Sequence, residues 1–366
     1  MKKNIAIIGA SALQLPLIER AKELGYVTHV FAWKANDVGE KAADFFYPLS
    51  IIEKELILDK CKDIGICGIC SIASDLAAVT VNYVATSLGL SGNSMEVTMK
   101  STNKHLMRTA FAQKGDPSPK SYLVDSEQGI NALKLEYPII IKPTDRSGSR
   151  GITKLDSPKE LKEAVDHALT ESFENKILVE EYVDGKEYSV ECISYNGKHH
   201  FLALTEKFTT GAPNFIETGH FEPAIVAKDT LNRIIEIIFH ALDSLGIQNS
   251  ASHSEIKIND NGEIKIIEIG GRMGGDCIGS DLVKYSTGID YVRAVIQVAC
   301  GLEPDLTPVC EPIPVEVRFI FTESDIDEYE RVKKENRLIR MVYFYPDNIG
   351  KITDSSNRAG CYVFRR

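Results

Sequence analysis

The stretch at residues 254–275 reads SEIKINDNGEIKIIEIGGRMGG, and it decides how the rest of the chain is interpreted. Asn261-Gly262 is a strong hairpin signal, and the residues on both sides of it alternate between apolar and charged. If these two residues form the loop, Asp260 faces Glu263 and every further pair along the ladder is fixed. The sequence therefore predicts a β-hairpin over residues 252–269.

In this register Glu255 faces Glu268. Two carboxylates directly opposed across a ladder repel each other and destabilise the sheet unless cations lie between them. Magnesium binds one or two carboxylates together with phosphate oxygens and water, as in nucleotide sites. The pair therefore predicts ligands for Mg²⁺, with Mn²⁺ as the alternative cation, although a register shift of one residue would separate the two side chains.

Four glycines surround Arg272 directly after the hairpin: Gly270, Gly271, Gly274 and Gly275. Glycines allow the backbone to approach a ligand closely. The planar guanidinium offers paired donors to a phosphoryl group or a carboxylate. The alternative interpretation is a surface arginine in a mobile loop.

A second candidate site begins at Lys142, which ends the apolar strand predicted over residues 137–142. The following residues, TDRSGSRGI at 144–152, form a loop of small hydroxyl side chains, glycines and two arginines. Such a loop can bring backbone N–H groups and hydroxyls to phosphate oxygens. It lacks the G-x-x-x-x-G-K-[ST] pattern of a P-loop, and an ordinary flexible hairpin loop is the alternative.

Paired glutamates end the strand predicted over residues 176–182, in the run LVEEYVDGKEYS at 178–189. Taken alone, they are typical of a solvated strand edge. In a nucleotide site, the same main chain could bond an adenine edge while a glutamate holds the ribose.

The composition favours a cytoplasmic enzyme of two or three domains. The chain has 366 residues and a formal charge of −10, which argues against a nucleic-acid partner. No apolar run approaches the roughly 18 residues of a membrane span. The eight scattered cysteines are expected to be reduced. Cys67 and Cys70 have redox or metal spacing, but they are predicted to be buried strand thiols because no second pair accompanies them.

The first hundred residues alternate strand and helix, with strands predicted at 3–8, 27–33 and 64–72 and a helix at 14–24. This order predicts a small parallel sheet with helices on both faces. The turn after the first strand keeps only Gly9 of the dinucleotide fingerprint, so a nicotinamide or flavin site is disfavoured.

Taken together, these segments resemble the ATP-grasp superfamily in order and approximate spacing over nearly the whole chain. The resemblance implies an N-terminal Rossmann-like α/β domain at 1–100, an ATP-grasp α+β domain at 101–300 with a lid at about 119–185, and a strand-rich part at 301–366. It also implies ATP and Mg²⁺ as cofactors. The implied roles are phosphate contacts at Lys104, Lys142, Ser147, Gly148, Ser149 and Gly151, adenine contacts at Glu180, Glu181, Tyr182 and Val183, ribose contact at Glu187, metal ligands at Glu255 and Glu268, and catalysis by Lys142 and Arg272.

Within the superfamily, the chain looks most like the bacterial L-amino-acid ligases that make dipeptides. Three segments carry this likeness: LQLP at 13–16, FIETGHFEP at 215–223 and GRMGGD at 271–276. The likeness implies substrate contacts at Glu217, His220, Arg272, Gly275 and Asp276, whereas His253 is expected to be structural.

The likeness also implies a carboxylate and an amine as substrates, an acyl-phosphate intermediate, release of ADP and phosphate, and a homodimer. Two departures stand out. Gly270 replaces the asparagine of the Glu-x-Asn pattern that supplies a further metal ligand in many relatives, and the chain stops six residues after SNRAG at 356–360, where related chains continue into a helix. The alternatives are a phosphoribosylamine–glycine ligase, a bicarbonate-activating carboxylase subunit, or a nucleotide-binding regulator without turnover.

Overall fold

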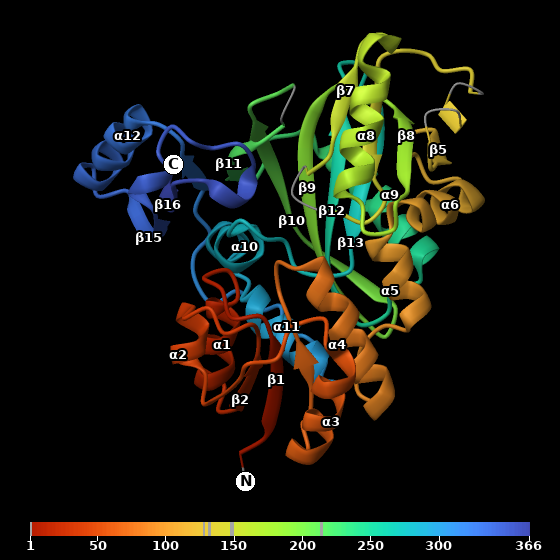
Figure 1. Ribbon diagram of the computed structural model, residues 1–366. Helices are drawn as coiled ribbons and strands as arrows, with labels where there is room; N and C mark the ends of the chain where they lie inside the picture. The colour runs from red at the N-terminus through yellow and green to blue at the C-terminus, as the bar shows by residue number, and fades with distance from the viewer. Residues whose placement is uncertain (1, 127–128, 131–132, 147–149, 213–214) are drawn as a thin grey trace.

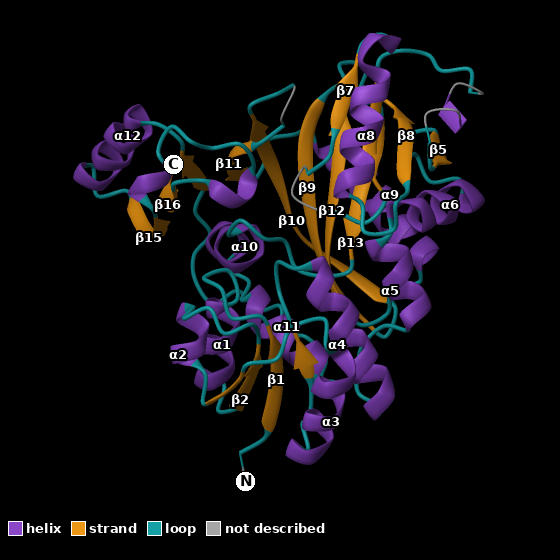
Figure 2. Cartoon of the chain, viewed as in Figure 1, coloured by secondary structure: helices purple, strands orange, loops and turns teal. Residues whose placement is uncertain are grey.

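The structure is a computed structural model that describes residues 2–126, 129–130, 133–146, 150–212 and 215–366. Its strands form three sheets, of four, eight and four strands. Figure 1 shows the first sheet at the bottom, next to the N-terminus, and the third sheet at the upper right with helix α8 across it. The eight-stranded sheet runs between them and extends to the C-terminal strands, and Figure 2 shows helices packed along its lower part.

The first sheet is parallel, as the alternating pattern predicts, with the strand order β3-β2-β1-β4. The predicted strand at 64–72 is wrong in its first half. Ile64 is the last residue of a helix, and Gly65 ends that helix in the left-handed conformation. The elements are β1 (Asn4–Ile8), α1 (Leu15–Glu23), β2 (Val27–Phe31), α2 (Val38–Ala42), β3 (Phe45–Tyr47), α3 (Lys54–Ile64), β4 (Ile69–Cys70) and α4 (Asp75–Leu88).

Helix α11 (Tyr291–Ala299) packs between the first sheet and the eight-stranded sheet. Its buried side chains share one core with Ile5 and Ile7 of β1 and with Ile193 and Ala251 of the larger sheet. This shared core joins the N-terminal α/β unit to the strands that carry the carboxylates.

The eight-stranded sheet is antiparallel in the order β13-β12-β9-β10-β11-β14-β16-β15. Helices α6 and α9 pack on its first strands through a common apolar core. The elements are α5 (Met95–Thr102), α6 (Lys104–Lys114), β9 (Lys186–Tyr195), β10 (Lys198–Thr209), β11 (Glu217–Glu222), α9 (Lys228–Leu245), β12 (Ser250–Ile258), β13 (Ile264–Gly270), α10 (Val283–Thr287), β14 (Val315–Ile320), α12 (Glu323–Lys334), β15 (Leu338–Phe344) and β16 (Gly360–Arg365).

The third sheet has the order β5-β8-β6-β7, and helix α8 packs on it. Its elements are β5 (Ser121–Val124), β6 (Ile139–Pro143), β7 (Thr153–Leu155), α8 (Leu161–Glu171) and β8 (Ile177–Glu181). In the part of the chain that the structure describes, no helix is long and apolar enough to cross a membrane.

The β12–β13 hairpin brings Glu255 opposite Glu268, but not through the predicted loop. Asn259 rather than Asp260 pairs with Glu263, so the loop has three residues and closes on Gly262 at φ +74°. A bulge at Ile267 adds one residue to β13 and restores the predicted pairing further along.

Candidate active site

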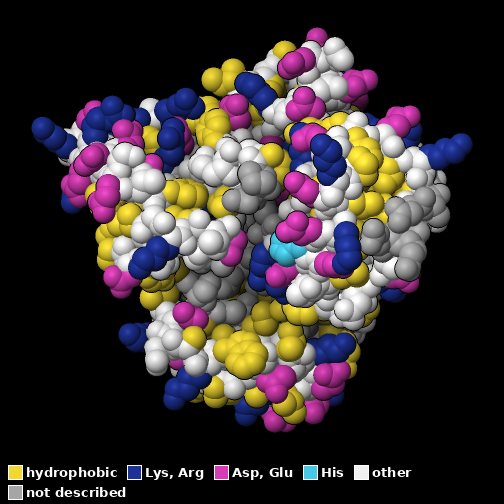
Figure 3. Space-filling view, turned by 45° about the horizontal axis from the view of Figure 1, so that its top comes forward, with side chains coloured by type: hydrophobic (Ala, Val, Ile, Leu, Met, Phe, Trp, Pro, Cys, Tyr) yellow, Lys and Arg dark blue, Asp and Glu magenta, His cyan; other side chains and the backbone are white. Residues whose placement is uncertain are grey.

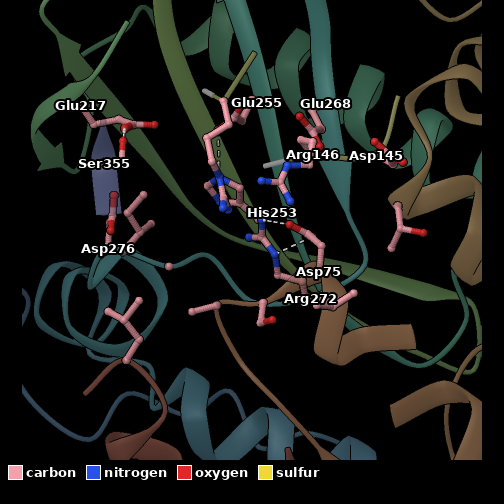
Figure 4. Close-up of a pocket in the computed structure, with 18 of the residues that line it drawn as sticks. Asp75, Asp145, Arg146, Glu217, His253, Glu255, Glu268, Arg272, Asp276 and Ser355 are labelled. Carbon is pink, nitrogen blue, oxygen red and sulfur yellow. Dashed lines mark hydrogen bonds and ion pairs between the residues drawn. The ribbon is translucent and has the colours of Figure 1, made fainter. Parts of the chain in front are cut away.

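A cavity of about 730 Å³ opens where the three sheets meet. Figure 3 shows this hollow on one face of the molecule, with acidic, basic and histidine side chains around it. In Figure 4, Glu255 and His253 lie near its centre, Glu268 and Arg146 on one side, and Glu217 and Asp276 on the other. The cavity therefore has two sides, which meet at the carboxylates of the hairpin.

Each hairpin carboxylate is paired with one lysine. Glu268 Oε1 lies 2.9 Å from Lys104 Nζ, and Glu255 Oε1 lies 2.6 Å from Lys207 Nζ. Burial raises the pKa of Glu255, but Lys207 and His253 outweigh burial and hold it well below its usual range. Glu255 is therefore anionic, and both glutamates present carboxylate oxygens on the cavity wall.

Glu255 and Glu268 fit a magnesium site of the nucleotide type. Both line the cavity and keep about a quarter of their side-chain surface exposed, 24% and 25%. Among the described residues, no three His, Cys, Asp or Glu side chains converge to hold a metal ion. The protein thus offers two carboxylates, and the remaining ligands must come from phosphate and water, as Mg²⁺ prefers.

The structure explains why Gly270 stands where the Glu-x-Asn pattern has asparagine. A Cβ at Gly270 would lie 2.8 Å from Asp75 Oδ1 and 3.3 Å from Arg272 Nε. Asp75, at the start of α4, accepts from Arg272 Nε at 2.8 Å and Nη2 at 2.9 Å. This two-pronged ion pair occupies the space that any side chain at position 270 would need.

Arg272 lines the cavity, and Asp75 fixes its orientation. Burial lowers the pKa of Arg272 and the Asp75 charge raises it, so the guanidinium stays charged. Nη1 makes only a long contact of 3.4 Å to the Met273 carbonyl, so it is the part of the group best placed to bind a ligand.

His253 connects two carboxylates, Glu191 and Glu255. Its Nδ1 bonds to Glu191, which is fully buried and accepts from the Gly274 amide at 3.0 Å through its second oxygen. Its Nε2 lies 3.5 Å from Glu255 Oε1. Burial lowers the pKa of His253, but Glu191 and Glu255 raise it to about 9. The His253 ring is therefore a positively charged group at the centre of the cavity.

The side chain of Glu180 is paired inside the protein, and its predicted adenine contact, a main-chain one, stays a prediction. Its carboxylate is buried and accepts from Arg108 Nε at 2.8 Å and pairs with Lys142 Nζ at 2.6 Å. Burial raises the pKa of Glu180, and the two cations lower it to about 2. Glu180 thus positions Lys142, while Arg108 Nη2 also donates to the carbonyl of the bulge residue Ile267 at 2.6 Å.

The remaining nucleotide residues are distributed along β8 and β9. Glu181 pairs with Lys265 at 3.2 Å, and the Tyr182 ring lies under Lys154, 4.5 Å from its centre. Val183 follows in the connection to β9, and Glu187 pairs with Lys207 at 2.9 Å.

The glycine-rich loop is described only at its ends. Lys104 Nζ donates to the Arg146 carbonyl at 2.7 Å, which brings the loop next to Glu268. Gly151 has a φ of +71° that favours glycine. The predicted phosphate contacts at Ser147, Gly148 and Ser149 lie outside the described residues.

The predicted substrate residues do gather on the far side of the cavity. Glu217 Oε2 accepts from Ser355 Oγ at 2.6 Å, and Asp276 Oδ1 accepts from Arg358 Nη2 at 2.7 Å. His220 is buried, with Nε2 3.7 Å from Asp276 Oδ2. The cavity lining there includes Glu217, His220, Gly275, Asp276, Ser355 and Arg358.

Five residues that hold the site together were not predicted from the sequence: Lys207, Asp75, Glu191, Arg108 and Arg358. Lys207 gave the clearest signal, since it is a lysine within the strand-like run FLALTEKF at 201–208, where apolar residues predominate. The other four pair with residues more than 60 positions away, so a local pattern does not reveal these contacts.

Residues 135–281 match the family model described as an ATP-grasp domain. The chain therefore contains an ATP-grasp domain. The alanine–anticapsin ligase of Bacillus subtilis is 28% identical over 310 residues, which cover 75% of this chain and 65% of that protein. This ATP-grasp chain thus spans just under two thirds of the length of that relative.

Solved structures show the same fold over the full chain. The L-amino acid ligase from Bacillus licheniformis is 24% identical, with a TM-score of 0.83 over 100% of this chain and 93% of that one. The phosphoribosylglycinamide synthetase from Anaerococcus prevotii is also 24% identical, with a TM-score of 0.80 over 100% and 94%. The predicted fold, an ATP-grasp fold with an N-terminal α/β unit and a strand-rich C-terminal part, is confirmed.

Proposed function

We propose that this protein is an ATP-dependent carboxylate–amine ligase that joins L-amino acids through an acyl phosphate and releases ADP and phosphate. The observation that carries the proposal is the pair Glu255 and Glu268, which face each other across the hairpin and lie between the predicted phosphate residues and the predicted substrate residues. The likeness to ligases that include alanine–anticapsin ligase and carnosine synthase supports the same class.

The first step transfers the γ-phosphoryl group of ATP to the substrate carboxylate. A carboxylate oxygen attacks phosphorus, the bond to ADP breaks, and an acyl phosphate forms. Bound Mg²⁺ supplies charge neutralisation on the phosphates. Lys104, Lys142 and Arg272 add fixed positive charge, which favours a transition state with negative charge spread over the phosphoryl oxygens.

The second step joins the amine. Its nitrogen attacks the acyl carbon, phosphate leaves with the C–O bond electrons, and the nitrogen loses a proton to give the amide. Exclusion of water from the cavity would protect the acyl phosphate, which water otherwise hydrolyses.

An amino acid as the acyl substrate suits the far side of the cavity. Glu217 and Asp276 each use one oxygen on a neighbouring donor, while Glu217 Oε1 stays 3.9 Å from Lys207 and Asp276 Oδ2 stays 3.7 Å from His220. These two oxygens suit an α-ammonium group. They also disfavour a phosphoribosylamine–glycine ligase, because a ribose phosphate would face two carboxylates there.

Hydroxylamine trapping tests the proposal one substrate at a time. The protein is incubated with ATP, Mg²⁺, hydroxylamine and each of the twenty L-amino acids, and hydroxamate and ADP are measured. We expect hydroxamate and ADP in equal amounts with one or a few amino acids. AMP in place of ADP would contradict an acyl phosphate, and ATP binding without any hydroxamate would favour the non-catalytic regulator.

Three further expectations stay predictions. They are the homodimer, the cytoplasmic location and the domain boundaries at residues 100 and 300. A bicarbonate-activating carboxylase subunit is the remaining alternative, and bicarbonate-dependent release of phosphate without an amino acid would favour it.

A further inference from the structure

Lys207 is buried at the point where the nucleotide, metal and substrate residues meet. Only 3% of its side chain is exposed, and it projects from β10 toward carboxylates on three other strands. Its Nζ lies 2.6 Å from Glu255 Oε1, 2.9 Å from Glu187 Oε1 and 3.9 Å from Glu217 Oε1. One ammonium group therefore neutralises residues assigned to three different ligands.

Lys104 and Lys207 form a matched pair around the hairpin. Lys104 holds Glu268 and contacts the Arg146 carbonyl, so it belongs to the phosphate side. Lys207 holds Glu255 on the other side, and Figure 4 places Glu255 between Glu217 and Glu268. In the metal-free protein, each metal carboxylate is thus held by a lysine of its own.

A divalent cation on Glu255 must compete with Lys207. Like charges close together repel strongly in a cavity with little water. Once Glu255 binds the cation, the ammonium group retains its neighbours Glu187 and Glu217 and can accept a new anionic partner. The carboxylate of an acyl substrate bound beside Glu217 supplies that partner.

Two arginines of the cavity are held more rigidly than Lys207. Arg272 is held by Asp75 through two nitrogens, and Arg358 is held by Asp276. A lysine ammonium can rotate toward a new partner more easily than a guanidinium clamped by two bonds. Lys207 can therefore move between two partners more easily than these two arginines.

We propose that Lys207 is a catalytic residue that holds Glu255 in the metal-free protein, yields it to the cation of Mg–ATP, and then binds the carboxylate of the acyl substrate. The second half rests on the proposed ligase function. The first half concerns metal binding alone, so the two can be tested separately.

Titration with Mn²⁺ in the presence of ADP, followed by electron paramagnetic resonance, tests the exchange without any turnover. Lys207→Met removes the competitor, so Mn²⁺ should bind at least about tenfold more tightly, which is the size expected even with the screening of bulk water. Lys186→Met is the matched control, because Lys186 begins β9 of the same sheet, its side chain is 74% exposed, and it pairs with Glu206 at 3.6 Å. Its Mn²⁺ affinity should equal that of the wild type.

The Lys207→Met protein should bind Mn²⁺ more tightly but turn over more slowly. The Lys207→Met protein should lose about a hundredfold in kcat with the substrate found by hydroxylamine trapping, a typical cost for one lost transition-state donor. Lys207→Arg keeps the charge and should bind Mn²⁺ as the wild type does. Tighter metal binding with slower turnover is a combination that a purely structural lysine does not produce.

Equal or weaker Mn²⁺ binding in a folded Lys207→Met protein would overturn the exchange. Wild-type kcat with tighter Mn²⁺ binding would overturn the substrate contact. If the variant does not fold, the wild type provides the test: the ¹³Cε resonance of Lys207 should move when Mg²⁺ is added to the ADP complex, and an unmoved resonance would refute the exchange. Absence of any ligase activity would count against the proposed function and leave the metal comparison intact.

Discussion

Replacing Glu180 by Gln should destabilise the protein because it leaves Lys142 and Arg108 buried without an anion. The pKa of Glu180 is about 2 in the folded protein, against an ordinary value of 4.5. Each pKa unit corresponds to about 1.4 kcal/mol, so the ionised carboxylate stabilises the fold by about 3 kcal/mol at pH 7. A loss of this size agrees with measured costs of breaking buried ion pairs, about 3–5 kcal/mol.

The pH dependence has a definite sign. Because the folded pKa is depressed, the stabilisation is complete above pH 4.5 and is lost as the pH falls toward 2. Urea unfolding of both proteins should give a difference of about 3 kcal/mol at pH 7 and about 2 kcal/mol at pH 3.5.

Glu181→Gln is the matched control, one residue along the same strand. Its carboxylate is 35% exposed and pairs with the similarly exposed Lys265, so its loss should cost under about 0.5 kcal/mol. Equal stability changes in the two variants, or no change for Glu180→Gln at pH 7, would refute the assignment of Glu180 as the anchor of Lys142.

Three further variants test other parts of the site and core. Arg272→Ala should lower kcat by about 10²–10³ and leave ADP affinity unchanged by calorimetry; normal turnover would remove its catalytic role. Glu268→Gln should raise the Mg²⁺ concentration needed for half-maximal ADP binding by about tenfold, and an unchanged Mg²⁺ requirement would rule out this ligand. Burial raises the pKa of Glu222 to about 8, so its stabilising effect is lost as the pH rises from 4.5 through 8. Glu222→Gln should therefore be more stable than the wild type at pH 9, by up to about 5 kcal/mol, and equal to it at pH 4; parallel pH profiles would contradict this.

The β12–β13 hairpin shows which features could be predicted from the sequence and which could not. The Asn-Gly signal correctly predicts a turn and two strands, because turn chemistry and strand alternation are local properties. The length of the loop was wrong by one residue, and the bulge at Ile267 corrects the register. That bulge is held by Arg108, 159 positions away, which no local pattern could reveal.

In the candidate active site, too, residues with a recognisable pattern were predicted and their distant partners were not. Residues that the superfamily pattern marks, such as Glu255, Glu268 and Arg272, meet at one cavity. Their partners come from elsewhere in the fold, as Asp75 does for Arg272 across 197 positions. Helix α12 was also missed, because it is strongly charged and buries only Val332, so its apolar stripe is weak.

The most direct test of the central claim measures phosphate release from ATP and Mg²⁺ with every pair of the twenty L-amino acids, followed by mass spectrometry of the active reactions. We expect release that requires an amino acid, together with ADP and the mass of a dipeptide. Binding of ATP without phosphate release for any pair would contradict the assignment of L-amino acids as the substrates.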